Sequence, residues 1–101
     1  MRLIAISKLR EAAAIYPDVS NQIEDIHQTI KQAHWQNLVD VQKTFSTAEA
    51  VGSFTIINIK GNKYRLILDI NYEKQLIFFK YFLTHAEYSK NKWKNDTHYK
   101  S

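Results

Sequence analysis

The chain has 101 residues, a formal net charge of +4 and no cysteine. This length predicts one domain, and the lack of cysteine excludes a disulfide framework, a thiol nucleophile and a cysteine-ligated metal site. No apolar run is long enough for a transmembrane helix, and charges interrupt the N-terminal segment too often for a secretory signal, so we expect a cytoplasmic protein with no membrane partner.

The positive charge is concentrated in the second half of the chain. Residues 1–53 contain five Lys and Arg against six Asp and Glu, a balance of −1. Residues 54–101 contain nine against four, a balance of +5. This asymmetry indicates that a nucleic acid or another polyanion docks on the second half.

The chain begins with features of a short strand and a helix. Leu3–Ile6 is an apolar run that predicts an edge strand. Ser7 is a suitable N-cap for a helix over roughly 8–16, and Pro17 ends that helix. Helical spacing places one set of side chains on its buried face: Leu9, Ala12, Ala13 and Tyr16.

Two further helices are predicted before the strands begin. The second helix runs from about 19 to 33, with a buried stripe of Ile23, Ile26, Ile30 and Ala33. Trp35 follows it as a core anchor. A third helix over about 38–45 buries Leu38, Val41 and Phe45, and residues 46–53 form a loop into the strands.

A hairpin is predicted around Gly61-Asn62, which separates two alternating apolar runs. A two-residue loop with glycine suits a tight turn, because glycine takes the positive φ that such turns require. This turn fixes the register, with five opposed pairs: Ile59 with Tyr64, Asn58 with Arg65, Ile57 with Leu66, Ile56 with Ile67, and Thr55 with Leu68.

A second turn near Glu73-Lys74 sends the chain back as a third strand over 75–83. A two-residue turn there places Ile77, Phe79 and Tyr81 on the apolar face of the sheet and Lys80 on the polar face. The predicted fold is therefore α+β, with a helical layer packed on one face of a small antiparallel sheet.

The polar face gathers Lys60, Lys63, Arg65 and Lys80. A solvated surface is one interpretation of each lysine. However, like charges opposed across strands repel each other, and an anionic ligand would relieve that repulsion. Three more polar side chains follow the last strand: His85, Glu87 and Tyr88.

The sequence contains no glycine-rich phosphate loop, no HExxH motif and no GxSxG motif. We therefore expect neither a metal nor another cofactor. The residues that remain can cleave RNA without a metal ion. Histidine transfers protons near neutral pH, Lys and Arg stabilise charge on the phosphate, and tyrosine hydrogen-bonds the phosphate or stacks on a base.

Three segments resemble the HigB-type toxins of bacterial type II toxin–antitoxin modules, a branch of the RelE superfamily. They are NIKGNKYRLI at 58–67, INYEK at 70–74 and THAEY at 84–88. The start is similar too, with a short strand, the helix sequence SKLREAAAIYPD and an AHW segment at 33–35. The resemblance covers roughly residues 1–90, which we predict to be one RelE-like toxin domain.

The resemblance implies a ribosome-dependent mRNA endonuclease, an mRNA interferase that blocks translation. It implies as partners a helix-turn-helix antitoxin, mRNA on the ribosome, and operator DNA through the antitoxin. By position, the resemblance implies that the scissile phosphate is held and stabilised by Lys60, Lys63 and Arg65. His85 would transfer protons, and Tyr88 would orient the substrate or stack on a base. Two residues complete the predicted RNA-binding set: Asn62, which matches the motif but is first of all a turn residue, and Lys80, which belongs to the set through its place on the polar face.

Two alternatives stay open at this point. One is a noncatalytic toxin of the related ParE type, which shares the fold and poisons gyrase without cutting RNA. The other is a basic module that binds RNA or ribosomes. Residues 91–101 form a basic polar C-terminal tail, for which the composition favours a frayed end over a short helix or an RNA-contacting arm.

Overall fold

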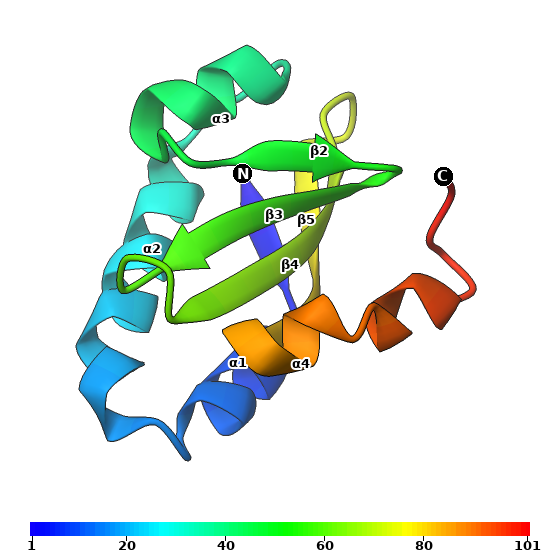
Figure 1. The fold of residues 1–101 in the computed structure, drawn as a ribbon. Helices are drawn as coiled ribbons and strands as arrows, with labels where there is room; N and C mark the ends of the chain where they lie inside the picture. Colours follow the sequence, from blue (N-terminus) through cyan, green and yellow to red (C-terminus); the bar gives the residue numbers. More distant parts are fainter.

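The computed structural model describes residues 1–101, which form a five-stranded sheet with helices packed against it (Figure 1). The strand order is β1-β5-β4-β3-β2. The elements are β1 (Arg2–Ile4), α1 (Ile6–Ala13), η1 (Pro17–Val19), α2 (Ser20–Gln32), α3 (Leu38–Thr44), β2 (Glu49–Val51), β3 (Phe54–Ile59), β4 (Tyr64–Asn71), β5 (Leu76–Thr84), α4 (His85–Ser89) and η2 (Lys92–Asn95). The α+β class is confirmed, although the sheet is mixed because β1 runs parallel to β5.

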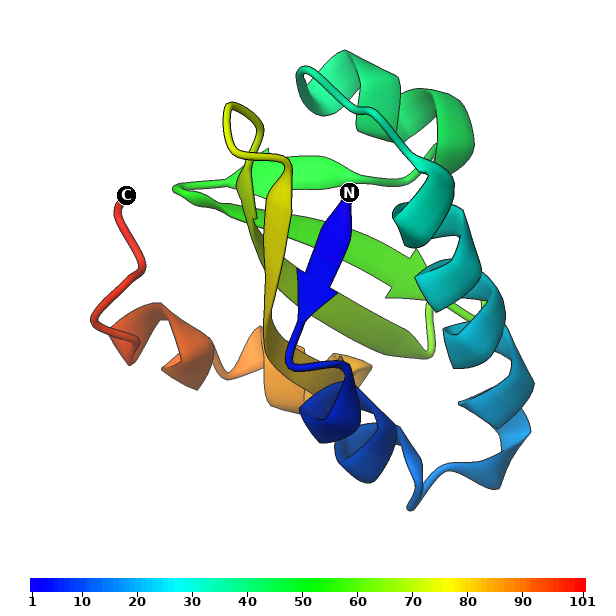
Figure 2. The same cartoon turned by 180° about the vertical axis from the view of Figure 1, so that it is seen from behind.

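The main core lies between the inner face of the sheet and helices α1, α2 and α3. Seen from behind, α1 and α2 flank strands β1 and β5 (Figure 2). The predicted helical stripes point into this core, which also holds Trp35 as the sequence indicates. The core residues of the helices and their connections are Leu9, Ala13, Val19, Ile23, Ile26, Ile30, Trp35 and Val41. Burying each large aliphatic side chain contributes roughly 1.5–3 kcal/mol.

The β3–β4 hairpin has the predicted register at all five opposed pairs, from Thr55 with Leu68 to Ile59 with Tyr64. The turn itself differs from the prediction. Positive φ angles occur at Lys60 (52°) and Gly61 (66°), not at Asn62, and the Lys63 amide donates to the Lys60 carbonyl at 3.4 Å. The alternating strands thus determine the register, while the turn adopts a different conformation.

The β4–β5 pair contains an irregularity that the sequence prediction missed. Leu68 pairs with Phe79, but Ile67 pairs with Tyr81, so Lys80 is an extra residue in a β-bulge. One extra residue moves the following side chains to the opposite face. The prediction that Tyr81 lies on the apolar inner face is therefore wrong, and Phe82 occupies the core instead.

Two smaller differences concern the N-terminal half. Helix α1 begins at Ile6, and its N-cap position is Ala5 in the left-handed region (φ 47°), so Ser7 is not the cap. The predicted loop 46–53 contains β2, which pairs with the start of β3. Because β2 has only the residues Glu, Ala and Val, its strand propensity is weak.

The C-terminal segment covers part of the outer face of the sheet. A second group of apolar side chains, here called the outer cluster, consists of Phe54, Ile56, Ile67 and Trp93, with Val51, Tyr81, Leu83, Tyr88 and Tyr99 packed against it. Trp93 is only 3% exposed. The expectation of a frayed end is therefore wrong.

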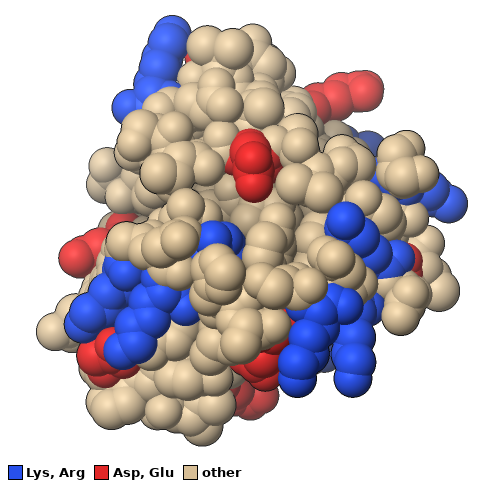
Figure 3. Space-filling model, viewed as in Figure 1, with Lys and Arg blue, Asp and Glu red and all other residues tan.

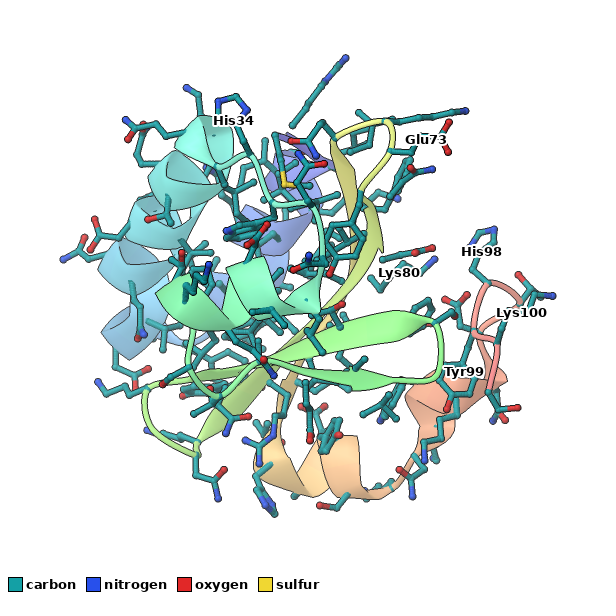
Figure 4. The ribbon with its side chains drawn as sticks, turned by 90° about the horizontal axis from the view of Figure 1, so that it is seen from above. His34, Glu73, Lys80, His98, Tyr99 and Lys100 are labelled. Carbon is teal, nitrogen blue, oxygen red and sulfur yellow. The ribbon has the colours of Figure 1, made fainter.

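Glycine at position 52 lets the chain end dock beside the β2–β3 turn (Figure 4). Gly52 has φ +58°, and an added Cβ would come within 2.3 Å of the Lys100 carbonyl. The Ser53 amide also donates to that carbonyl at 2.7 Å. The segment is thus held to the sheet by backbone contacts as well as by aromatic packing.

None of the helices is both long and apolar enough to cross a membrane.

Truncating Leu68, which has no exposed surface, should lower the free energy of unfolding. We expect Leu68→Ala to cost about 2–5 kcal/mol, the range for a truncated buried leucine. Val39→Ala is the matched control, because Val39 is 60% exposed; it should change stability by less than about 0.5 kcal/mol. Urea denaturation measures both, and equal effects would show that Leu68 is not a core residue.

Candidate active site

Arg65 lies at the centre of the candidate site, on the outer face of β4. Its guanidinium donates from Nη1 to the Asn62 carbonyl (3.0 Å) and the Tyr64 carbonyl (3.3 Å), and from Nη2 to Asn62 Oδ1 (2.6 Å). Only 8% of the residue is exposed. A guanidinium has about five N–H donors, and the chain uses three, so two are left for an oxyanion.

Tyr88 from α4 lies over Arg65 in a layered stack. The guanidinium carbon is 5.2 Å from the Tyr88 ring centroid, and the other neighbour is Trp93, whose ring lies 5.3 Å away and nearly parallel. Burial raises the pKa of Tyr88, and Glu49 raises it further, while Arg65 opposes the shift. The phenol is therefore protonated at neutral pH and can donate a hydrogen bond.

The segment from Thr84 to Glu87 forms a capping box that starts helix α4. The Thr84 hydroxyl accepts from the Glu87 amide at 3.2 Å, and the Glu87 carboxylate accepts from the Thr84 amide at 2.9 Å. These two bonds satisfy amides at the helix start. Glu87 therefore has a structural role.

His85 is the first residue of α4 and is exposed. Its amide donates to the Lys63 carbonyl at 3.0 Å, which attaches the helix start to the β3–β4 hairpin. Its ring Nδ1 lies 3.5 Å from the Ser89 hydroxyl. The imidazole is therefore accessible, and its backbone is held beside the basic turn.

Lys60 and Lys63 at the hairpin tip share one carboxylate, that of Asp18. Their Nζ atoms lie 3.4 Å and 3.1 Å from Asp18 Oδ2. The hydrogen bond with Lys63 lowers the pKa of Asp18, and the same contact raises the pKa of Lys63. Asp18 was not identified from the sequence, where it follows Pro17 and resembles an ordinary turn residue.

Lys80 is separate from the other predicted site residues. Its Nζ lies 3.4 Å from Asp96 Oδ2 and 2.8 Å from His98 Nδ1, and Tyr81 donates its hydroxyl proton to the same carboxylate oxygen at 2.8 Å. Figure 4 shows Lys80 directed toward His98 of the C-terminal segment. Lys80 and Asp96 are 14% and 13% exposed, so this ion pair attaches the segment to the sheet.

Figure 3 shows two of the larger basic areas of this face in its lower half. One lies over the tip of the β3–β4 hairpin and the other over α4 and η2, with the β4 strand between them. The structure brings six of the predicted residues to one end of the sheet, namely Lys60, Asn62, Lys63, Arg65, His85 and Tyr88.

Neutralising Asp18 should strengthen binding to RNA. In Asp18→Asn the two hairpin lysines lose their shared counter-charge, so they can release counterions when they contact phosphates. One additional phosphate contact steepens the salt dependence of log K by about 0.7 for a single strand. Titrating a labelled single-stranded RNA at several salt concentrations measures this slope.

The matched control for that experiment is Glu24→Gln, which removes one carboxylate from a distant exposed pair with Arg10 (2.8 Å). It should leave the salt dependence near the native value. An Asp18→Asn slope equal to the Glu24→Gln slope would show that the hairpin lysines do not contact RNA.

Comparison with known proteins identifies the family of this chain. A model of the HigB toxin family, described as the RelE-like toxic component of a toxin–antitoxin system, matches residues 19–91. The chain is 24% identical over 93 residues to the mRNA interferase HigB of Escherichia coli O6:H1, covering 89% of this chain and 90% of that protein. It is 23% identical over 91 residues to the mRNA interferase toxin HigB of Escherichia coli K12, covering 87% and 88%, and equally similar to the mRNA interferase HigB of Shigella flexneri. The chain therefore belongs to the HigB family of RelE-like toxins.

Proposed function

We propose that this toxin is a ribosome-dependent mRNA endonuclease that blocks translation. The observation that carries the proposal is Arg65, which keeps two N–H donors free close to the basic hairpin tip, where the His85 amide donates to the Lys63 carbonyl. The family match and the names of the relatives support the same activity.

The proposed reaction uses the 2′-hydroxyl of the substrate as the nucleophile. The 2′-oxygen attacks the adjacent phosphorus, the bond from phosphorus to the 5′-oxygen breaks, and the products are a cyclic phosphate and a 5′-hydroxyl. One proton leaves the 2′-hydroxyl and one is delivered to the 5′-oxygen. His85 is the group suited to proton transfer at neutral pH.

Charge develops on the nonbridging oxygens during this reaction. The remaining donors of Arg65 and the ammonium groups of Lys60 and Lys63 would stabilise that charge, while Asn62 holds Arg65 in place. The protonated Tyr88 hydroxyl would donate to the phosphate, or its ring would stack on a base. These groups are cationic or neutral donors, so we propose cleavage without a protein-bound metal ion.

Membership of the family implies an antitoxin partner. We propose that this partner is a helix-turn-helix protein that represses the operon, so that the toxin contacts operator DNA only through it. The substrate would be mRNA on the ribosome, which places the activity in the cytoplasm.

Incubating the full chain with ribosomes programmed by a defined message tests the proposal. We expect new 5′ ends inside the coding region, seen by primer extension, and none when the same message is free. Arrest of translation with intact message would instead favour a noncatalytic ParE-like toxin or a ribosome-binding module.

A further inference from the structure

A hollow of about 270 Å³ lies beside the candidate active site, between the outer face of β5 and the C-terminal segment. Its lining residues are Tyr81, Leu83, Glu87, Lys90, Lys92 and Trp93. Leu83 pairs across the strands with Arg65. The hollow therefore opens next to the proposed position of the scissile phosphate.

The two lysines of this hollow differ from the other basic residues of the face. Lys60 and Lys63 share Asp18, and Lys80 is paired with Asp96. Lys90 and Lys92 form no ion pair and no side-chain hydrogen bond within the chain, and both are exposed. Lys90 follows α4 directly and Lys92 is the first residue of η2. The hollow is therefore lined by two lysines that have no acidic partner within the chain.

The walls of the hollow combine three kinds of group. Tyr81 and Leu83 are apolar and half-buried, while the ring faces of Trp93 are occupied by Tyr88 and Phe54, so Trp93 supplies a wall and not a stacking surface. One Glu87 oxygen accepts from the Thr84 amide, and a carboxylate has further acceptor sites. An apolar wall with two cations and one acceptor suits a ligand that has a flat ring, an anionic group and an N–H donor.

We propose that this hollow binds one ribonucleotide of the RNA substrate, next to the nucleotide whose phosphate is cleaved. The base packs against Tyr81 and Leu83, its amino group donates to Glu87, and its phosphate lies on Lys90 and Lys92. At about 270 Å³ the hollow lies just below the range of about 300–1,000 Å³ that is typical of drug-sized ligands, so it has room for no more than one nucleotide. The inference rests on the proposed function.

The family match ends at residue 91, so Lys92 and Trp93 lie beyond it. The site is thus built by the last strand of the matched region together with the C-terminal segment. Lys92 and Trp93 thus add contacts to a hollow whose other lining residues lie within the matched region.

The test titrates the full chain with each of the four ribonucleoside 5′-monophosphates. NMR signals of the Leu83 methyl groups and the Trp93 indole N–H report binding. We expect saturable shifts of both signals, with AMP, GMP or CMP binding more tightly than UMP because uracil lacks an amino group. The Lys90→Ala/Lys92→Ala variant should bind at least about tenfold more weakly, because two charge-assisted contacts to phosphate are lost.

The matched control is Lys8→Ala/Lys74→Ala, which removes the same charge from two exposed lysines outside the lining. It should bind nearly as tightly as the native chain. An equal loss of nucleotide affinity in the two variants would show that only the overall charge matters, and it would overturn the proposal. Inorganic phosphate that shifts the same signals with equal affinity would also overturn it, because the base would then contribute nothing.

This result is independent of the cleavage assay. If the native chain cleaves ribosome-bound mRNA but no nucleotide shifts Leu83, the inference fails and the proposed function stands. If nucleotides bind in the hollow but no message is cleaved, the proposed function fails and the nucleotide site remains.

Discussion

Replacing Arg65 by alanine should slow cleavage of ribosome-bound mRNA by roughly 100- to 1,000-fold, the typical effect of removing one donor that stabilises transition-state charge. Arg65 keeps two free N–H donors, and its fork can hold two phosphate oxygens at once. Single-turnover cleavage under saturating ribosomes measures the chemical step.

Arg65 also contributes to the fold, and the experiment must separate the two roles. The sequence suggests a dispensable side chain on a polar face, but Arg65 is 8% exposed and holds the hairpin tip through Asn62. Arg65→Lys keeps the charge and loses the planar fork, so we expect an intermediate rate. Arg10→Ala, on the exposed surface of α1, is the control and should cleave like the native chain. A folded Arg65→Ala protein with native activity would exclude Arg65 from catalysis.

Replacing His85 by alanine should slow the same reaction by about 100- to 10,000-fold, the usual range for loss of general acid–base catalysis. The imidazole is exposed and its helix is capped by Thr84 and Glu87, so thermal stability should change little. The rate should also lose its dependence on pH near neutrality. Rates measured from about pH 6 to 8, the range in which histidine titrates, test this.

His34→Ala is the matched control, because His34 is also exposed but lies at the far end of α2 (Figure 4). Its rate and pH profile should equal those of the native chain. If His85→Ala cleaves at the native rate, proton transfer belongs to another group, and Arg65, Lys60, Lys63 and Tyr88 must support the reaction without it.

The sequence predicts the buried core of this protein well, because burial of one face of a strand or helix makes apolar residues recur at a regular spacing. The two-residue alternation of β3 and β4 allows only one register that buries Ile57, Leu66 and Leu68 together, and the structure has that register. The helical stripe of α2 is equally constrained, since Ile23, Ile26 and Ile30 all reach the core.

The failures have local physical causes. At the bulge, Lys80 contacts Asp96 and His98, which lie 16 and 18 residues further along the chain, so no local pattern indicates these contacts. The C-terminal segment contains five charged residues after Ser89, a composition typical of a frayed end. Its two aromatic residues, Trp93 and Tyr99, nevertheless pack with Phe54.

The structure brings only some of the predicted site residues together, because the pairing of charges depends on the three-dimensional fold. Sequence position brings Lys63, Arg65 and His85 to the same region, as the structure shows. The sequence does not indicate that Asp18 pairs with Lys60 and Lys63, which lie 42 and 45 residues further along the chain. Nor does it indicate that Lys80 forms an ion pair with Asp96. The catalytic roles themselves stay predictions.

The most direct test of the central proposal compares the native chain with an Arg65→Ala/His85→Ala double variant on one ribosome-bound message. Circular dichroism must first show that the double variant is folded. We predict that the native chain produces 5′-hydroxyl ends within the coding region and that the double variant produces none. Cleavage of the message by the folded double variant, or translation arrest by the native chain with no cut in the message, would contradict the account.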